Sequence, residues 1–339
     1  MKRKLIIHVG MGKTGSSSIQ KTLRVAGSAL EKQGFKYLGL MFEHLDFPKR
    51  YTWKKVNGWM DFLGLDRVQA HRELAHVLQY ADDTLPEEMH TLIWSNESLF
   101  DRFSDVEPAL KAVKSRYEIH VVGYVRRPDS WIVSAYMQWG IKDKSYTGPL
   151  KSFNTWVADR PYVVSSKISA WTEFSDFPVF YNFDVISDVG AHFIDRVLFQ
   201  SPEVIPSLRE NDTPPPEAMA LFAWHNSLFE GLVPPDELES LLKRAGLLDK
   251  MQISTPYNNL LPSEEEVSNY LKRNRAEIDR TNSILESMAQ PRFDLDDLKY
   301  KDYSVNPLGT NRALLRLVVH LSRDIESLKK RVAELEAGK

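Results

Sequence analysis

Five short apolar runs, separated by longer amphipathic stretches, constrain the fold of this chain more than any other feature. The runs are rich in β-branched and aromatic residues, and they cover residues 5–9, 35–40, 91–96, 119–125 and 179–183. Between them, hydrophobic residues recur at helical spacing, as in 69–81 and 106–116. This alternation is typical of a parallel sheet covered by helices. We therefore predict an α/β fold.

The composition excludes several classes of protein. The chain has 339 residues and a formal charge of −2, which is not the strongly basic balance of a dedicated nucleic-acid binder. It contains no cysteine, which excludes disulfides, zinc–thiolate centres and thiol nucleophiles. No apolar stretch has the length of a signal-peptide core or a membrane span. We expect a cytoplasmic protein with no nucleic-acid partner and no membrane span.

The composition changes at residues 202–216, which read PEVIPSLRENDTPPP. Proline, asparagine and aspartate interrupt regular structure, so a boundary is expected here. After it the pattern is helical and charged, with no clear strand. We predict an α/β core over 1–211, a helical appendage over 212–310 and an amphipathic coiled-coil helix over 311–339.

The last segment carries a heptad pattern. Apolar residues alternate in steps of four and three, with β-branched side chains at a and leucine at d: Leu314, Val318, Leu321, Ile325, Leu328, Val332 and Leu335. This combination favours a parallel two-stranded coil, in which Asp324 would face Lys329 of a second copy and Arg331 would face Glu336. We predict a homodimer through residues 314–335. The alternative is a helix that packs on its own core.

A glycine-rich turn follows the first apolar run. It reads GMGKTGSSS over residues 10–18 and leads into a helical pattern that begins near Ser16. Backbone N–H groups converge where such a helix begins, and the Lys13 side chain and three serine hydroxyls add further donors. We predict an anion site here, at the edge where parallel α/β sheets bind ligands. The alternative is a ligand-free turn with capping serines.

This loop departs from the nucleotide-kinase P-loop, which has Gly, four further residues and then Gly-Lys-Ser/Thr. Counted back from Gly12 and Lys13, the first glycine would stand at position 7, where the chain has Ile7. The later runs end in WSNES and GYVRRPDS, without an acidic residue placed directly at the strand end to hold magnesium. A nucleotide-dependent kinase is therefore disfavoured but stays as an alternative.

The loop resembles the first motif of the PAPS-dependent sulfotransferases, in particular the bacterial and glycan-modifying branch that begins G-x-x-K-T-G-T/S-T/S-S-I-Q. PAPS is 3′-phosphoadenosine 5′-phosphosulfate. In that family the loop binds the 5′-phosphosulfate, and its lysine contacts the bridging oxygen. The resemblance implies a P-loop-like sheet flanked by helices, with PAPS as co-substrate, and we expect no required metal. The cofactor-binding residues it implies are Gly12, Lys13, Thr14, Gly15, Ser16, Ser17 and Ser18.

A second motif of that family is expected about a hundred residues later, and VRRPDSWIVSAY supplies it. The resemblance implies that Arg126 and Ser134 bind the 3′-phosphate, as a guanidinium and a hydroxyl are suited to do. Trp131 stands where many relatives carry a further arginine, a function that Arg127 could take over. The resemblance covers about residues 4–211, with VFYNFDVI and LRENDT as weaker matches.

Sulfuryl transfer also needs a base for the acceptor proton, and Glu97 is our candidate because it directly follows the third run. Glycan-modifying relatives are similar in placing a carboxylate there. The alternative is that Glu97 only occupies the first turn of a helix capped by Ser95 or Asn96. His44, after the second run, is the substitute base.

The acceptor is expected to be a saccharide or glycolipid, mostly on the resemblance. Aromatic residues that could stack on sugars follow the second and fourth runs, although they could equally pack in the core: Trp53, Trp59, Tyr136, Trp139 and Tyr146. We therefore predict a PAPS-dependent sulfotransferase that acts on a hydroxyl or amine, with Lys13 stabilising the leaving phosphate. The alternatives are a P-loop kinase and a non-catalytic nucleotide-binding scaffold.

Overall fold

The computed structural model describes residues 2–209, 214–227, 229–233, 236–244, 257, 260–299, 303, 304 and several short stretches between 314 and 332. The chain forms two compact units. The first comprises Met1–Arg127, Tyr162–Glu210 and Asn274–Asp296, and the second comprises the remainder, Pro128–Pro161, Asn211–Arg273 and Asp297–Lys339.

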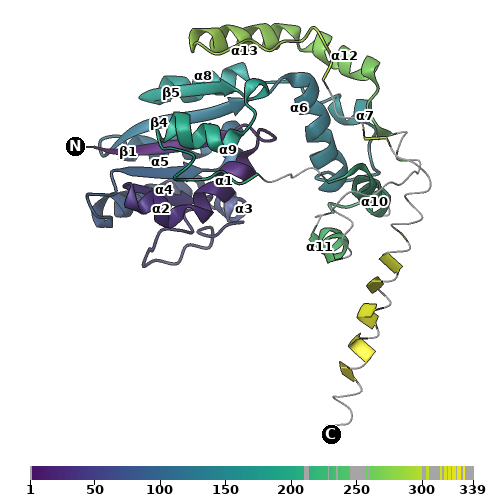
Figure 1. The fold of residues 1–339 in the computed structure, drawn as a ribbon, viewed down its shortest axis with the longest axis horizontal. Coiled ribbons are helices and arrows are strands. Elements are labelled where there is room, and N and C mark those ends of the chain that lie inside the picture. Colours follow the sequence, from purple (N-terminus) through teal and green to yellow (C-terminus); the bar gives the residue numbers. More distant parts are fainter. Residues whose placement is uncertain are drawn as a thin grey trace. The chain divides into compact units, whose positions relative to one another are not determined.

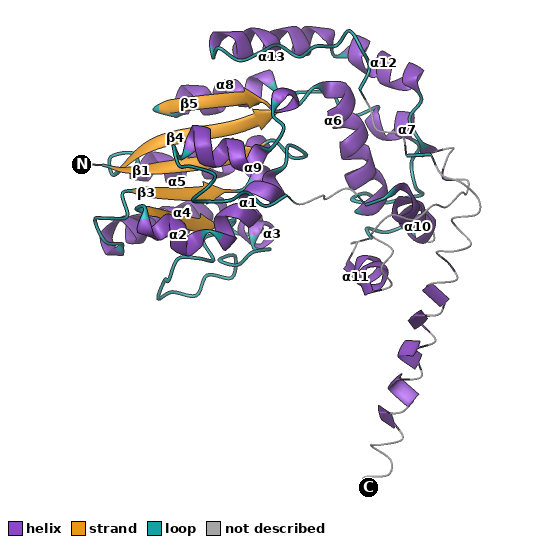
Figure 2. Cartoon of the chain, viewed as in Figure 1, coloured by secondary structure: helices purple, strands orange, loops and turns teal. Residues whose placement is uncertain are grey.

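The first unit contains a five-stranded sheet in which every strand pair is parallel (Figures 1 and 2). The strand order is β2-β3-β1-β4-β5. The strands are β1 (Arg3–Gly10), β2 (Phe35–Gly39), β3 (Thr91–Ser95), β4 (Tyr117–Val125) and β5 (Phe177–Asn182). Each predicted run forms one of these strands, so the predicted α/β class with a helix-flanked parallel sheet is confirmed.

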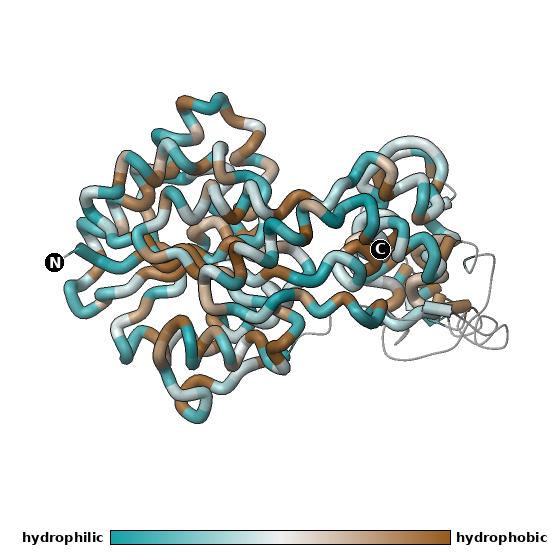
Figure 3. The backbone as a smooth tube through the Cα atoms, turned by 90° about the horizontal axis from the view of Figure 1, so that it is seen from above, coloured by the Kyte–Doolittle hydropathy of each residue, from teal (hydrophilic) through white to brown (hydrophobic). Residues whose placement is uncertain are grey.

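Helices cover both faces of this sheet. The chain moves from β1 to β2 in one direction across the sheet and from β2 through β5 in the other, so right-handed crossovers place their helices on opposite faces. One face carries α1 (Ser16–Val25) and α2 (Gly27–Lys32). The other carries α4 (Arg67–Thr84), α5 (Phe103–Val113) and α8 (Ser165–Phe174). Hydrophobic and hydrophilic residues alternate along the tube in Figure 3, as expected for helices that bury one side.

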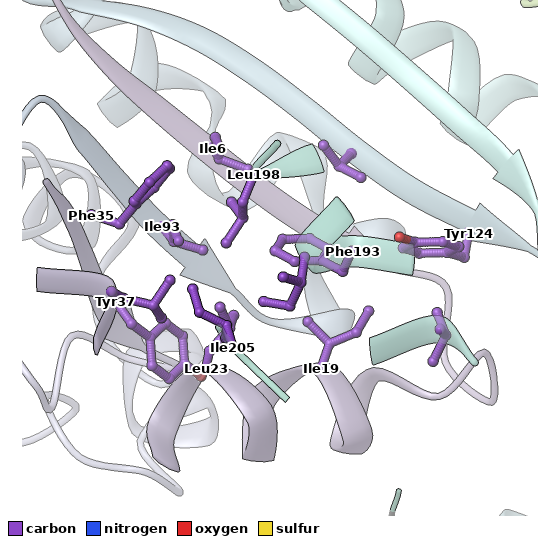
Figure 4. Packing of buried hydrophobic residues seen from close by; sticks show 14 residues of the cluster. Ile6, Ile19, Leu23, Phe35, Tyr37, Ile93, Tyr124, Phe193, Leu198 and Ile205 are labelled. Atoms are coloured by element: carbon purple, nitrogen blue, oxygen red, sulfur yellow. The ribbon is translucent and has the colours of Figure 1, made fainter. Parts of the chain in front are cut away.

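The core between the sheet and α1 is shown in Figure 4. Ile6 and Tyr124 of the sheet belong to the same buried cluster as Ile19 and Leu23 of α1. Two short helices complete it, α9 (Val189–His192) and η4 (Phe193–Val197). This packing fixes α1, and with it the loop that precedes α1, against the carboxyl end of β1.

Helix α13 (Arg275–Ser287) packs on α8 and β5 in the first unit, although the sequence places it in the appendage of residues 212–310. Hydrogen bonds attach α13 to the beginning of α8. Glu277 Oε1 accepts the N–H groups of Val164 and Ser165, at 2.8 and 2.6 Å. Burial acts to raise the pKa of Glu277, but the hydrogen bonds it accepts hold that pKa below its usual value. Glu277 therefore serves α8 as a remote cap.

The second unit is built of helices. It contains α6 (Pro128–Ala135), the π-helix η2 (Tyr136–Lys142), α7 (Phe153–Val157), α10 (Pro216–Ser227), α11 (Asp236–Arg244) and α12 (Glu264–Arg273). Residues 128–161 thus cluster with this unit rather than with the predicted core. The contacts explain this, because α6 packs on α12 and η2 packs on α10. The Asn226 amide also donates to the carbonyl groups of Ile141 and Lys142, at 2.6 and 3.0 Å.

Every residue between 314 and 332 that the structure describes is helical. Five apolar side chains of the heptad pattern are between 40% and 57% exposed there: Val318, Leu321, Ile325, Leu328 and Val332. Leu335 and Glu336 lie outside the described residues. Across the described parts of the chain, no helix combines the length and the apolar character needed to cross a membrane.

Candidate functional site

All five strands of the sheet end at one edge, because every strand pair is parallel. The glycine-rich loop follows β1, Glu97 follows β3 after one residue, Arg126 follows β4, and Asp184 follows β5 after one residue. Ligands of such sheets bind at the carboxyl ends of the strands. The residues directly after the strands are therefore the candidates for a site.

Gly10 allows the loop to lie against the segment that carries Glu97. Its φ is +91°, and a Cβ atom at this position would stand 2.9 Å from both Cα and Cβ of Glu97. On the other side, the N–H of Met11 donates to the Tyr124 carbonyl of β4 at 2.8 Å. The beginning of the loop is thus held between the ends of β3 and β4.

The middle of the loop is a tight turn. Lys13 has a φ of +69° and Gly15 one of +76°. The Thr14 hydroxyl donates to the Met11 carbonyl at 2.6 Å and so closes the turn from within. A Cβ atom on Gly15 would stand 2.6 Å from Cγ1 of Val189, so glycine is required for the approach of α9 as well as for the backbone angle.

Helix α1 begins at Ser16, as predicted, but no serine caps it. Its N-cap residue is Gly15, which offers no side chain, and its first turn has no acidic residue. The Ser16 hydroxyl is buried and has no hydrogen-bond partner among the described residues. Leaving such a group unpaired costs about 1–3 kcal/mol, which an oxyanion at this position would recover. A helix N-terminus and a buried hydroxyl that lacks a partner together indicate an anion site.

Arg126 lies beside this loop. Its Nη1 donates to the Lys13 carbonyl at 3.0 Å, and its guanidinium carbon is 5.6 Å from the centre of the Phe183 ring. Arg127 is only 2% exposed, and its backbone N–H donates to Asp184 at 2.7 Å. The structure therefore brings Lys13 and Arg126 together in the first unit. The other residue of the second motif, Ser134, belongs to the second unit, on α6.

Glu97 is the first residue of the short helix η1 (Glu97–Asp101), which Asn96 caps by accepting the N–H of Ser98 at 3.0 Å. The Glu97 side chain is not a cap: its Oε2 accepts from Nε2 of Gln20, on α1, at 2.7 Å. Sequence reasoning missed Gln20. Two signals were available: Gln20 is the last residue of the first motif, and it stands four residues after Ser16, which puts both on one face of α1.

The substitute base His44 has a different environment. Its Nε2 is 3.9 Å from Oε1 of Glu43, and that carboxylate also accepts the backbone N–H groups of Leu40 and Met41. His8, two residues before Gly10, is fully buried, and burial lowers its pKa to about 3. His8 is therefore neutral and adds no positive charge to the site.

Two of the aromatic residues considered for sugar stacking pack in the interior instead. Trp53 and Tyr136 have no exposed surface. The Trp53 indole stacks on Tyr51 and donates to Glu73 at 2.7 Å, and the Tyr136 hydroxyl donates to the Lys151 carbonyl at 2.9 Å. Neither the Trp53 ring nor the Tyr136 ring is therefore available to stack on a sugar.

Comparison with protein-family models and with curated proteins finds no match for this chain. Within the part of the chain that the structure describes, no three His, Cys, Asp or Glu side chains are grouped so that they could hold a metal ion. The functional assignment therefore rests on the loop, on its contact with Arg126, and on Glu97, whose carboxylate contacts Gln20 of α1.

Proposed function

We propose that this protein is a PAPS-dependent sulfotransferase that transfers a sulfuryl group to a hydroxyl or amine of an acceptor, a saccharide or glycolipid. One observation carries the proposal: the Arg126 guanidinium donates to the Lys13 carbonyl, so two cationic side chains from separate motifs lie at one sheet edge. A nucleotide with phosphates at both its 3′ and 5′ positions needs two such cations. The lack of cysteine is in line with action in the cytoplasm.

The loop fits a 5′-phosphosulfate. Ser16 supplies a buried hydroxyl that lacks a partner among the described residues, and the beginning of α1 supplies backbone N–H groups. The turn at Lys13 adds a cation that can meet the bridging oxygen. We assign the same phosphate group to Gly12, Thr14, Gly15, Ser17 and Ser18, and the 3′-phosphate to Arg126 of the same unit.

The proposed reaction forms a bond between sulfur and the acceptor atom and breaks the bond between sulfur and the bridging phosphate oxygen. Lys13 stabilises the negative charge that develops on that leaving oxygen. Glu97 takes the proton that the acceptor loses. Gln20 occupies Oε2 of Glu97, while Oε1 has no hydrogen-bond partner among the described residues, so the proton goes to Oε1. The nucleotide product is 3′,5′-ADP.

Calorimetry with 3′,5′-ADP tests the nucleotide site. The wild-type protein should bind 3′,5′-ADP in a buffer with EDTA more tightly than it binds ATP in a buffer with magnesium. Arg126→Ala should weaken 3′,5′-ADP binding by about 10- to 100-fold, because a charge-assisted hydrogen bond contributes about 1.5–3 kcal/mol. The matched control is Arg102→Ala, which removes an exposed arginine of the same unit. Preference for ATP with magnesium would support the kinase alternative, and binding of neither nucleotide would support the scaffold.

Replacement of Glu97 tests the base. Glu97→Gln should lower the turnover number by about 10²- to 10⁴-fold, the usual contribution of a general base, with little change in 3′,5′-ADP affinity. The measurement is transfer of labelled sulfate from PAPS to candidate saccharides. Asp101→Asn, at the exposed end of the same short helix, is the control and should retain full turnover. An unchanged rate for Glu97→Gln would move the base elsewhere, with His44 as the next candidate.

We also propose that the protein is a homodimer through residues 314–335. The row of exposed heptad side chains supports this, because five apolar residues at coiled-coil spacing have between 40% and 57% of their surface in solvent. The charges beside the row are complementary between two parallel copies, with Asp324 opposite Lys329.

A further inference from the structure

A hollow of about 670 Å³ lies on the first unit, beside α4 and α5. None of its lining residues belongs to the glycine-rich loop or to the Glu97 and Arg126 segments. Its polar lining comprises Lys49, Tyr51, His71, Arg72, Glu73, His76 and Gln79. The volume is within the range of about 300–1,000 Å³ that small-molecule sites occupy.

The hollow has an excess of positive charge. The side chains of Lys49 and Arg72 have no hydrogen bond or ion pair with any other described residue, and the same is true of the His71 ring. Glu73 is the one carboxylate in the described lining, and both of its oxygens are engaged. Oε2 accepts from the Trp53 indole at 2.7 Å, and Oε1 accepts from the Gln69 amide at 2.8 Å. With two cations and one carboxylate, the lining has one net positive charge, and neither cation is paired with Glu73.

Neutral hydrogen-bonding groups line the same hollow. The Tyr51 hydroxyl is 3.0 Å from Nδ1 of His76, and burial raises the Tyr51 pKa, so this hydroxyl stays protonated. The Tyr51 ring is held in place by the buried Trp53, with which it stacks at 5.6 Å and 11°. Gln79 adds an amide that can both donate and accept. The Tyr51 hydroxyl and the Gln79 amide are neutral groups of the kind that bond to the hydroxyl groups of a sugar.

We propose that this hollow binds an anionic sugar, whose sulfate or phosphate ester pairs with Lys49 and Arg72 and whose hydroxyl groups bond to Tyr51, His76 and Gln79. Both esters present the same charged oxygens to a lysine and an arginine. The site is separate from the proposed transfer reaction and does not require it. A protein with this site would hold a sugar that already carries a charged ester.

Titration of the full chain with glucose 6-sulfate, glucose 6-phosphate and glucose tests the proposal. We expect saturable binding of at least one ester, shifts of the His71 and His76 imidazole signals in NMR spectra, and much weaker binding of glucose. The ester that binds more tightly shows whether the natural ligand carries a sulfate or a phosphate group. The double variant Lys49→Ser/Arg72→Ser should weaken ester binding by about tenfold or more, because two charge-assisted contacts are lost.

Two controls separate this site from the loop. Lys32→Ser/Arg67→Ser removes the same charge from exposed positions on α2 and α4 and should leave ester binding unchanged. Lys13→Ala should also leave it unchanged, so the outcome does not depend on the proposed sulfotransferase activity. The proposal is overturned if neither ester binds, if glucose binds as tightly as its esters, if the hollow variant binds like the wild type, or if Lys13→Ala abolishes ester binding.

Discussion

Replacing Lys13 by alanine is expected to lower the turnover number with PAPS by at least about 10²-fold, the usual effect of removing one donor that stabilises a developing oxyanion. Lys13 lies at the turn of the loop, where its carbonyl accepts from Arg126. The substitution removes the ammonium group and keeps this backbone contact. Binding of 3′,5′-ADP should fall less than turnover, because the leaving oxygen gains its charge only during transfer.

The fold of this variant should be intact. Lys13 has a φ of +69°, which is unfavourable for any residue with a Cβ atom, so alanine experiences the same backbone strain as lysine. Equal melting temperatures for the two proteins would confirm this. Lys32→Ala, at the exposed end of α2, is the matched control and should retain wild-type turnover. Near-normal transfer by Lys13→Ala would remove the loop from the reaction and defeat the site assignment.

Deletion of residues 312–339 is expected to convert a dimer into a monomer. The full chain should have about twice its sequence mass of 39.0 kDa in solution, as measured by light scattering. The reason is that the exposed row of Val318, Leu321, Ile325, Leu328 and Val332 loses its contact with water only when a second helix covers it. The truncated chain lacks this row and should have a single-chain mass.

A point substitution makes the same test without removing the segment. Ile325→Asp places a charge at a seam position and should dissociate the dimer, whereas Ser327→Asp, outside the seam, should not. A monomeric full chain, or a dimer that survives the deletion, would contradict the proposed coil. Nucleotide binding at the loop should be unaffected by either substitution, because the site residues Lys13, Arg126 and Glu97 all belong to the first unit.

The sheet could be predicted from sequence because it is buried on both faces. Parallel strands of this kind read as continuous apolar runs, and each predicted run forms a strand within two residues of its expected limits. The beginning of α1 at Ser16 was equally clear, because glycine marks the turn before it. Local chemistry determines these features, so local patterns reveal them.

Features that depend on contacts between distant residues could not be predicted from local sequence patterns. Gln20 contacts Glu97 across 77 positions of the chain, and no local pattern pairs them. The burial of Trp53 and Tyr136 depends on neighbouring rings that come together only in the folded chain. The sequence therefore could not decide whether these two residues stack on a sugar or pack in the core. The assignment of α13 to the first unit likewise follows from the hydrogen bonds that Glu277 accepts more than a hundred residues away.

The close approach at Gly10 fixes the spacing between the loop and Glu97. Because even one methyl group at Gly10 would overlap the Glu97 backbone, the two segments touch without intervening side chains. A donor molecule on the loop and an acceptor at the carboxylate would then meet across a gap that the main chain has already set. In the proposed reaction, the spacing between the donor loop and the base would therefore be set when the first unit folds, because main-chain contact alone determines it.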